Sequence, residues 1–489
     1  MPRLAVPLSA LLLASAGAGL VPRAATSAGG RADRSAIYGH SAPERPSGPV
    51  DLGAGPHLFL DDYLIESSEG LTRSANRPPR DPALPNPIVT GKEDGCFQPY
   101  LSVVRDPERG VFRLWYGART EDRRGDASRL AYLESPDGIR WQRPHRLLPD
   151  PGPIQFGVSV LDEGPGYPDR AKRYKYAWWH GGGLRVAGSP DGFRFTPLAG
   201  DRVLLPHNHD INGIFWDPIR KRYGAIASTY EPGPKWKGQR RVTMQSVSPD
   251  LRQWQEPWLV LTPEDGVDPG ETQFYAMDGI LARGDLLIGM VKVLRDDLVA
   301  DTPPDPPEQY GIGYTTLAWS RDGERWVRDR EHFFDPDPKR GAWDHAHAWI
   351  DEQVPVGDQV YLYYGGYARG HKVNRFEERQ LGLVRMRRDR YVARAAGETP
   401  GTLRTVVVVP RGDRLTLNVD AAGGEVRARL LKPDGTPLRG FTYADCRPIA
   451  SDSLDAPVRW KRPLAELKGK PVRLELQMRS AKLYALSVK

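Results

Sequence analysis

A fivefold repeat constrains this 489-residue chain more than any other feature. Each copy joins a turn rich in Asp, Pro, Gly or Arg to two apolar and aromatic runs, and most copies end in Ser-x-Asp-Gly-x-x-Trp or a close relative. These endings lie at residues 135–141, 189–195, 248–254 and 320–326, and a degenerate fifth, Asp-Arg-Tyr, lies at 389–391. Short β-branched and aromatic runs between turn residues predict strands, and a period of about 40 to 70 residues predicts an array of small sheets.

Five small sheets can bury their faces by packing around a common axis, as the blades of a β-propeller do. The sequence therefore predicts an all-β fold with a five-bladed β-propeller over residues 51–395. The Asp-Gly turns tighten hairpins, and the aromatic residue after each turn plugs the space between blades, so we interpret these motifs as scaffold. The apolar run at residues 57–65 precedes the first repeat, and we expect it to close the ring by joining the last blade.

The pattern changes to regular alternation of apolar and polar residues after about residue 396. Runs of this kind predict strands at 403–409, 414–419, 426–431, 472–478 and 483–488. They predict a C-terminal β-sandwich over residues 396–489. Such a module can bind glycans or only pack against its neighbour, so its fold does not assign it a role.

The first residues have the composition of an export signal. Arg3 precedes an apolar stretch over residues 4–20, and small residues follow it, which predicts a signal peptide at 1–28 and a secreted or periplasmic protein. No Cys lies in this segment, so we expect no lipid anchor. Residues 29–50 form a predicted flexible leader. Cys96 and Cys446 fall in different predicted domains, and two buried unpaired thiols are favoured over a bridge.

The formal charge of +7 and the pI near 9.2 come from scattered arginines, without a basic run. The chain also has no nucleic-acid motif, so a soluble protein with a mildly positive surface is favoured over a nucleic-acid binder. An acidic polysaccharide is a further candidate ligand for such a surface. The sequence does not indicate an oligomeric state.

Several segments resemble a known group of proteins. Residues 113–120 (RLWYGART), 135–141 (SPDGIRW) and 358–367 (DQVYLYYGGY) resemble the five-bladed propeller superfamily of glycoside hydrolases, which includes the invertase/levansucrase and arabinanase/xylosidase families. Residues 58–66 (LFLDDYLIE) and 441–460 (FTYADCRPIASDSLDAPVRW) resemble a poorly characterised group of exported bacterial glycosyl-hydrolase-like proteins. The resemblance implies a funnel on the propeller axis, where acidic residues from the starts of the innermost strands converge.

Glycosidic cleavage needs one protonated carboxyl group to donate to the leaving oxygen and one carboxylate to activate water or attack carbon. We expect Asp94 to be the water-activating base, Asp210 a supporting or alternative acid, and Glu271 the proton donor, because each precedes a predicted inner strand. The side chains expected to hold substrate lie at the same strand starts: His209, Asn212, Gln273, Tyr275, Asp344 and His347.

These candidates also have structural interpretations. Asp94 and Asp344 could form turns before strands, and Glu271 could point to solvent. Asp210 is favoured as functional, because an Asp flanked by His and Asn is costly to bury without purpose. The His-x-His pair at 345–347 could bind a metal ion together with His209 and Asp210. Hydrogen bonding of these side chains to sugar hydroxyls is favoured over metal binding. We therefore expect no metal or other cofactor.

The sequence thus predicts a secreted glycoside hydrolase that degrades a polysaccharide or oligosaccharide by acid/base chemistry in the propeller funnel. Two alternatives remain at this point: a propeller that binds glycans without cleaving them, and a surface scaffold that binds protein. Hydrolysis of a polysaccharide would distinguish the first interpretation from both alternatives.

Overall fold

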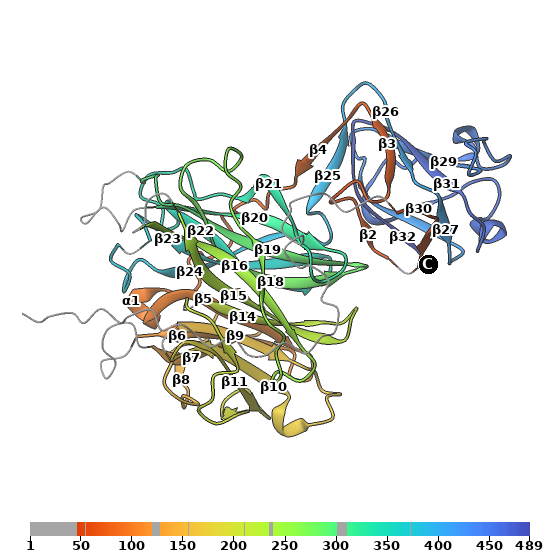
Figure 1. Ribbon diagram of the computed structural model, residues 1–489. Helices are drawn as coiled ribbons and strands as arrows, with labels where there is room; N and C mark the ends of the chain where they lie inside the picture. The colour runs from red at the N-terminus through yellow and green to blue at the C-terminus, as the bar shows by residue number, and fades with distance from the viewer. Residues whose placement is uncertain are drawn as a thin grey trace, which may run out of the picture. The chain divides into compact units, whose positions relative to one another are not determined.

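The computed structural model describes residues 46–53, 55–119, 128–154, 156–209, 211–233, 238–300, 311–371 and 373–489. Strands and turns make up nearly all of these residues (Figure 1), which confirms the predicted all-β class. The single α-helical turn α1 (Gly91–Asp94) precedes the first long strand. The predicted signal peptide and most of the predicted leader lie outside the described residues.

The repeat region folds into antiparallel sheets whose strands follow chain order. The first sheet contains β5 (Cys96–Asp106), β6 (Val111–Ala118), β7 (Arg129–Ser135) and β8 (Arg146–Leu147). The second contains β9 (Phe156–Asp162), β10 (Tyr174–Trp179), β11 (Gly183–Ser189), β12 (Thr196–Pro197) and β13 (Leu205–Pro206). The third contains β14 (Asn212–Asp217), β15 (Arg222–Pro232), β16 (Gln239–Ser248) and β17 (Trp258–Leu261).

The remaining strands of the repeat region form one seven-stranded sheet. It contains β18 (Thr272–Arg283), β19 (Leu286–Arg295), β20 (Ile312–Ser320), β21 (Val327–Phe334), β22 (His347–Val356), β23 (Gln359–Tyr367) and β24 (Gln380–Arg387). A single parallel pair, Gly313 with His347, joins β20 to β22, whereas all the other pairs in this sheet are antiparallel. An isolated bridge from Val89 to Leu381 extends it beyond β24.

Five strands contact one another in a closed cycle: β5 contacts β9, β9 contacts β14, β14 contacts β18, β18 contacts β22, and β22 returns to β5. Four of them are the first strands of their sheets, and β22 lies within the seven-stranded sheet. Side chains tie neighbouring members of this cycle to each other. Ser102 Oγ on β5 accepts a hydrogen bond of 2.9 Å from the backbone N–H of Val160 on β9. Asp351 Oδ2 on β22 accepts one of 2.5 Å from the N–H of Leu101 on β5. We call these five strands the inner strands.

The Ser-x-Asp turns behave as scaffold, as predicted. In each, the Asp carboxylate accepts hydrogen bonds from backbone N–H groups of the turn: Asp137, Asp191, Asp250 and Asp322. The carbonyl of the turn then reaches another sheet. Tyr363 Oη donates to the Gly138 carbonyl at 2.8 Å, and Trp115 Nε1 donates to the Gly192 carbonyl at 2.9 Å. Gly138 has a φ of +74°, which suits glycine.

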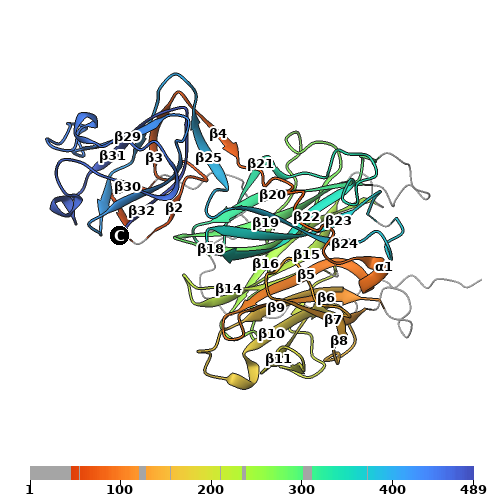
Figure 2. The ribbon, with the colours of Figure 1, turned by 180° about the vertical axis from the view of Figure 1, so that it is seen from behind.

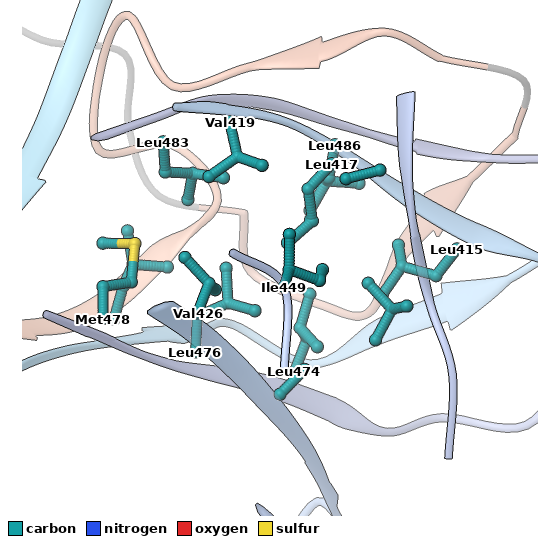
Figure 3. Packing of buried hydrophobic residues seen from close by; sticks show 14 of the residues in the cluster. Leu415, Leu417, Val419, Val426, Ile449, Leu474, Leu476, Met478, Leu483 and Leu486 are labelled. Carbon is teal, nitrogen blue, oxygen red and sulfur yellow. The ribbon is translucent and has the colours of Figure 1, made fainter. Parts of the chain in front are cut away.

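The C-terminal strands form two sheets that share one hydrophobic core (Figure 3). One sheet has the order β30 (Asp452–Val458), β28 (Leu415–Asp420), β32 (Ala481–Val488), β25 (Val392–Ala396) and β4 (Leu71–Ala75), with β2 (His57–Leu58) paired to β32. The other has the order β29 (Glu425–Leu431), β31 (Arg473–Arg479), β26 (Gly401–Thr405) and β3 (Ile65–Glu69). β1 (Val50–Leu52) pairs in parallel with β27 (Val408–Pro410).

The expectation that residues 57–65 close the ring is therefore wrong. β2 pairs with β32, beside which it lies in Figure 2, and β3 pairs with β26. The run is also interrupted: Asp61 Oδ1 accepts a hydrogen bond from the backbone N–H of Tyr63, which makes a turn in its middle. The run becomes two short strands instead of one long one. Both cysteines are buried and neither forms a disulfide bond, which confirms that no bridge joins them.

Candidate functional site

A cavity of about 240 Å³ lies between the inner strands, and residues of all five strands line it. Polar residues from all five strands line it: Ser102, Ser159, Asp162, Asn212, Asp278, Asp351, Glu352 and Gln353. A polar group in such a place is costly unless it is paired or used. We call this space the axial cavity.

Two carboxylates of the axial cavity, Asp278 and Asp351, contact the same buried lysine. Lys292 on β19 is fully buried, and its Nζ lies 2.7 Å from Asp278 Oδ2 and forms a second ion pair with Asp351 Oδ1. The ring of Tyr100 lies on the same ammonium group, with its centroid 5.2 Å away. Burial lowers the pKa of Lys292, and the charge of Asp278 counteracts that effect. The ammonium group of Lys292 is therefore shared by two carboxylates, those of Asp278 and Asp351.

Two of the inner strands, β22 and β18, contain β-bulges in this region. The register of β22 against β23 shifts between Ile350 and Glu352, so Asp351 is the extra residue. The register of β18 against β19 shifts between Phe274 and Ala276, so Tyr275 is the extra residue there. Bulges are concentrated next to active sites, where they re-aim a side chain.

Glu352 differs from its neighbours in its electrostatic surroundings. Burial raises the pKa of its carboxyl to about 8, and the negative charge of Asp278 adds to the rise, while the backbone of Gln353 and the charge of Lys292 oppose it. Glu352 is thus a neutral acid at neutral pH, and it lines the same cavity as Asp278 and Asp351, which contact Lys292.

A second cluster of polar and aromatic side chains lies near the starts of the inner strands β14, β18 and β22. Arg241 Nε donates to His209 Nε2 at 3.0 Å, and Arg241 also donates to Gln273 Oε1 at 3.0 Å. The ring of Tyr275 stacks on Trp349 with a centroid distance of 4.8 Å. It also contacts His209 and His371 edge-on, and its hydroxyl lies 2.7 Å from His371 Nε2. We call this set the strand-start cluster: His209, Arg241, Gln273, Tyr275, Trp349 and His371.

Asn212, the first residue of β14, links the two regions. It lines the axial cavity, and it lies two residues after Asp210 and three after His209 of the strand-start cluster. Its side chain is buried, yet neither atom of its amide has a hydrogen-bond partner among the described residues. A buried amide without partners is uncommon in native proteins, and it can offer one donor and one acceptor group to a ligand.

His347 lies at the start of β22, beside the strand-start cluster. Its Nε2 lies 3.0 Å from the carbonyl of Gly311, to which it donates in the neutral form, and its ring contacts Trp349 and Tyr367. Burial lowers the pKa of His347 to about 3. The ring is therefore neutral at physiological pH.

The structure brings together four of the predicted substrate residues and separates two carboxylates from them. His209, Gln273, Tyr275 and His347 form one set of contacts, with Asn212 close by in sequence. Asp94 and Asp344 are held by arginines instead, and neither lines the axial cavity.

Asp94 ends α1, where Arg143 donates two hydrogen bonds of 2.9 Å to its carboxylate and the backbone of Thr90 donates another. Asp344 is likewise bonded to Arg80 and to the hydroxyl of Tyr364. These contacts occupy both carboxylate oxygens of Asp94 and Oδ2 of Asp344, and they favour the structural interpretation of both residues.

The other two predicted catalytic residues are less fully described. Asp210 lies outside the described residues, although its neighbours His209 and Ile211 are both buried. Glu271 precedes β18 and is partly buried, and its backbone N–H donates to Asp297 Oδ1 at 3.1 Å. In the described part of the chain, no three His, Cys, Asp or Glu side chains are placed to hold a metal ion.

Sequence reasoning missed Lys292, Asp351 and Glu352, because it looked for carboxylates only before each inner strand. A signal did exist: Asp351-Glu352-Gln353 interrupts the otherwise apolar run at residues 348–356. Three polar residues in succession cannot all face solvent from a strand, since side chains alternate between its faces. At least one of them had to point inward.

Two comparisons of the sequence with known proteins found no match. No protein-family model matches the chain. No curated protein matches it either.

None of the helices in the described ranges is long and apolar enough to span a membrane.

Three solved structures illustrate what the chain is similar to. A glycosyl hydrolase from Bacteroides ovatus has 17% identity and a TM-score of 0.42, over 69% of this chain and 97% of that one. An N-acetylgalactosamine deacetylase from F. plautii has 15% identity and a TM-score of 0.41, over 67% and 96%. A β-fructofuranosidase from Bombyx mori has 12% identity and a TM-score of 0.38, over 80% and 94%. Their names include different reactions, so they do not assign one to this chain.

Proposed function

We propose that the repeat region is a five-bladed β-propeller and that the C-terminal sheets form a β-sandwich. Support for five blades comes from the closed cycle of inner strands, with β18–β21 and β22–β24 as separate blades within the seven-stranded sheet. Support for the sandwich comes from the single core that its two sheets share. In this partition the propeller begins near residue 76, because β1 to β4 pair with C-terminal strands.

We propose that the protein cleaves glycosidic bonds of a polysaccharide or oligosaccharide. The observation that supports this most is the pairing of a neutral acid, Glu352, with carboxylates that contact Lys292 in one cavity. Hydrolysis of a glycoside needs two carboxyl groups whose surroundings keep one protonated and one ionised. The axial cavity offers both on the axis of the proposed propeller.

The roles follow from these surroundings. Glu352 donates its proton to the glycosidic oxygen as the bond to the anomeric carbon breaks. Asp278, through an oxygen that does not face Lys292, accepts a proton from the attacking water or attacks the carbon itself. The strand-start cluster and Asn212 bind hydroxyl groups of the sugar, and Trp349 and Tyr275 add aromatic surface. Asp210 and Glu271 supply further carboxyl groups at the strand starts.

The experiment compares variants on a panel of polysaccharides and oligosaccharides, with new reducing ends as the readout. Glu352→Gln and Asp278→Asn are each expected to lose about a hundredfold to ten-thousandfold in rate. Asp265→Asn, which changes a side chain 93% exposed, is the matched control and keeps full activity. If Glu352→Gln and Asp278→Asn keep normal turnover while Asp210→Asn loses it, the catalytic pair lies at the strand starts instead.

A second function, glycan binding without cleavage, is favoured by one observation. The carboxylates of Asp94 and Asp344, which the sequence placed at the funnel, are both engaged by arginines. Binding to a glycan on an array, with no product from that glycan after prolonged incubation, would support this second function over hydrolysis.

We also propose that the protein is exported. The apolar stretch at residues 4–20 and the small residues after it support a cleaved signal peptide. Mass spectrometry of the protein recovered from the periplasm or the medium is expected to find an N-terminus between about residues 17 and 35. Recovery of the intact N-terminus with Met1 would contradict export by this route.

A further inference from the structure

The net positive charge of the chain is concentrated at its C-terminal end. Residues 396–489 hold 17 Lys and Arg against 10 Asp and Glu, a formal charge of +7. The whole chain has 69 basic and 62 acidic residues, so the preceding 395 residues hold 52 of each and are formally neutral. A module with this charge attracts anionic partners.

Part of this charge lies on one face of the sheet β29-β31-β26-β3. Alternate residues of these strands, such as Ala428 and Leu476, are buried in the shared core, so the residues between them face the other way. The register places Arg429 opposite Glu475, and Glu475 opposite Arg404, in one row across the sheet. We call this surface the arginine face.

Glu475, the central carboxylate of this row, has two arginines as hydrogen-bond partners. Glu475 is buried, and its oxygens accept hydrogen bonds of 2.5 Å from Arg404 Nε, 2.6 Å from Arg429 Nε and 2.8 Å from the hydroxyl of Tyr443. The side chains of Arg404 and Arg429 remain 36% and 29% exposed. One negative charge thus orients two guanidinium groups whose remaining N–H groups are available to solvent.

These arginines are held in place before any ligand arrives. The guanidinium carbon of Arg429 lies 4.7 Å from the ring centroid of Tyr443. A guanidinium stacked on a ring and bonded at one edge keeps its planar fork, which matches the two oxygens of a carboxylate or the oxygens of a sulfate ester. Preorganisation of this kind lowers the entropic cost of binding.

The adjacent row suits a ligand that has hydroxyl groups as well as charge. It consists of Arg427, Gln477 and Thr402, which the register aligns across β29, β31 and β26, and it ends at Glu69 on β3. Arg427 is 34% exposed and contacts Glu425 at 3.4 Å. An amide and a hydroxyl beside a row of guanidinium groups complement a charged sugar chain better than a phosphate backbone, which offers acceptors only.

We propose that the arginine face binds an anionic glycan through carboxylate or sulfate groups on its sugar units. This site is separate from the axial cavity, and the inference does not depend on whether the protein cleaves glycans. It assigns the C-terminal sheets a binding role that holds the protein on acidic polysaccharides.

The test uses pairs of polymers that differ in charge alone. The full protein is titrated calorimetrically with polygalacturonate and its methyl ester, and with dextran sulfate and dextran. The proposal expects binding to at least one charged polymer, weakening as salt rises, and none to its neutral counterpart. Binding to polygalacturonate alone identifies carboxylates, and binding to dextran sulfate alone identifies sulfates. Equal affinity for duplex DNA or anionic vesicles, equal affinity for the neutral polymers, or no binding to either charged polymer would overturn it.

Variants locate the site. Arg427→Gln/Arg429→Gln is expected to weaken binding at least about tenfold, because it removes two guanidinium groups that would form charge-assisted hydrogen bonds with the ligand. Arg414→Gln/Lys482→Gln removes the same charge next to or within strands of the other C-terminal sheet, and it should change affinity by less than about threefold. Equal losses in both double variants would overturn the proposed site.

A third variant separates recognition from folding. Arg404→Lys/Arg429→Lys keeps two positive charges opposite Glu475, so the sheet should fold normally, as measured by its thermal unfolding. Because an ammonium group cannot make the bidentate contact, this variant should also bind at least about fivefold more weakly. Unchanged affinity would show that only net charge matters and would contradict the proposed recognition.

Discussion

Lys292 Nζ lies 2.7 Å from Asp278 Oδ2, and the lysine side chain is completely buried. The two residues lie on neighbouring strands, where Lys292 is opposite Ala276 and Asp278 is opposite Met290. Asp351 contacts the same ammonium group from β22, so one cation holds carboxylates from two proposed blades together. This relationship makes stability and the proposed chemistry depend on the same three residues.

Lys292→Met is expected to lower the free energy of unfolding by about 3–5 kcal/mol, because it leaves two carboxylates in the axial cavity without their cation. Chemical denaturation measures the loss. Lys482→Met, at an exposed position on β32, is the control and should change stability by no more than about 0.5 kcal/mol. A stable Lys292→Met variant would mean that water replaces the lysine and that the cavity is open to solvent.

The pH dependence of stability should report on Glu352. Its pKa is about 8 in the folded chain against an ordinary value of 4.5, so the folded state holds more protons between these values. The stability that protonated Glu352 contributes to the folded state therefore falls as pH rises from about 4.5 to about 8, and it levels off above that. Glu352→Gln should therefore become more stable relative to the parent protein as pH increases. If the difference between the two proteins is the same at pH 5 and pH 8, Glu352 does not hold a proton.

The proposed acid role gives the same residue a kinetic signature. On a confirmed substrate, the rate should fall above about pH 8 as Glu352 ionises, because only the protonated form can donate to the leaving oxygen. An alkaline limb that persists unchanged in a Glu352→Asp variant with residual activity would assign the donor to another group.

The local parts of this fold were predictable, and the long-range parts were not. The Ser-x-Asp turns are visible in sequence because the Asp carboxylate accepts hydrogen bonds from residues within three positions of it, as at Asp137. The partner of β2 is not visible, because His57 pairs with Leu486 across most of the chain. No local pattern in residues 57–65 distinguishes the last blade from the C-terminal sheets.

The candidate site was predictable in part for a similar reason. His209, Gln273, Tyr275 and His347 lie at the starts of inner strands, where the repeat pattern alone indicates the axis. Glu352 lies within a strand, where a charged residue normally faces solvent. Its position in the cavity depends on the bulge at Asp351, which changes the alternation of side chains. Sequence does not show where a bulge falls.

Asp94→Asn is expected to lower the free energy of unfolding by about 1–3 kcal/mol, because Arg143 loses its bidentate partner. In a double-mutant cycle with Arg143→Gln, the two losses should not add, since both variants remove one interaction. Activity per folded molecule should stay normal. A variant that melts like the parent protein yet loses turnover would instead support Asp94 as the base.

His347 should contribute to acid lability. Its pKa of about 3 in the folded chain lies below the ordinary value of 6.5, so the unfolded chain binds more protons between these values. Stability from this group is lost as pH falls from about 6.5 to about 3. His347→Gln should flatten that part of the stability profile, whereas His145→Gln should not. Equal acid lability in all three proteins would contradict a neutral, buried His347.

The C-terminal sheets should require the N-terminal strands to fold. β2 pairs with β32, β3 with β26 and β4 with β25, and Phe59, Leu64 and Ile65 are part of the shared core. A fragment of residues 392–489 keeps β25 but lacks β2 to β4, so it exposes two sheet edges and part of its core, and we expect it to aggregate or to lack cooperative unfolding. The same fragment joined by a short flexible linker to residues 46–75 supplies the missing strands and should unfold cooperatively in thermal denaturation. Cooperative unfolding of both fragments at the same temperature would show that β2 to β4 add nothing to the sandwich.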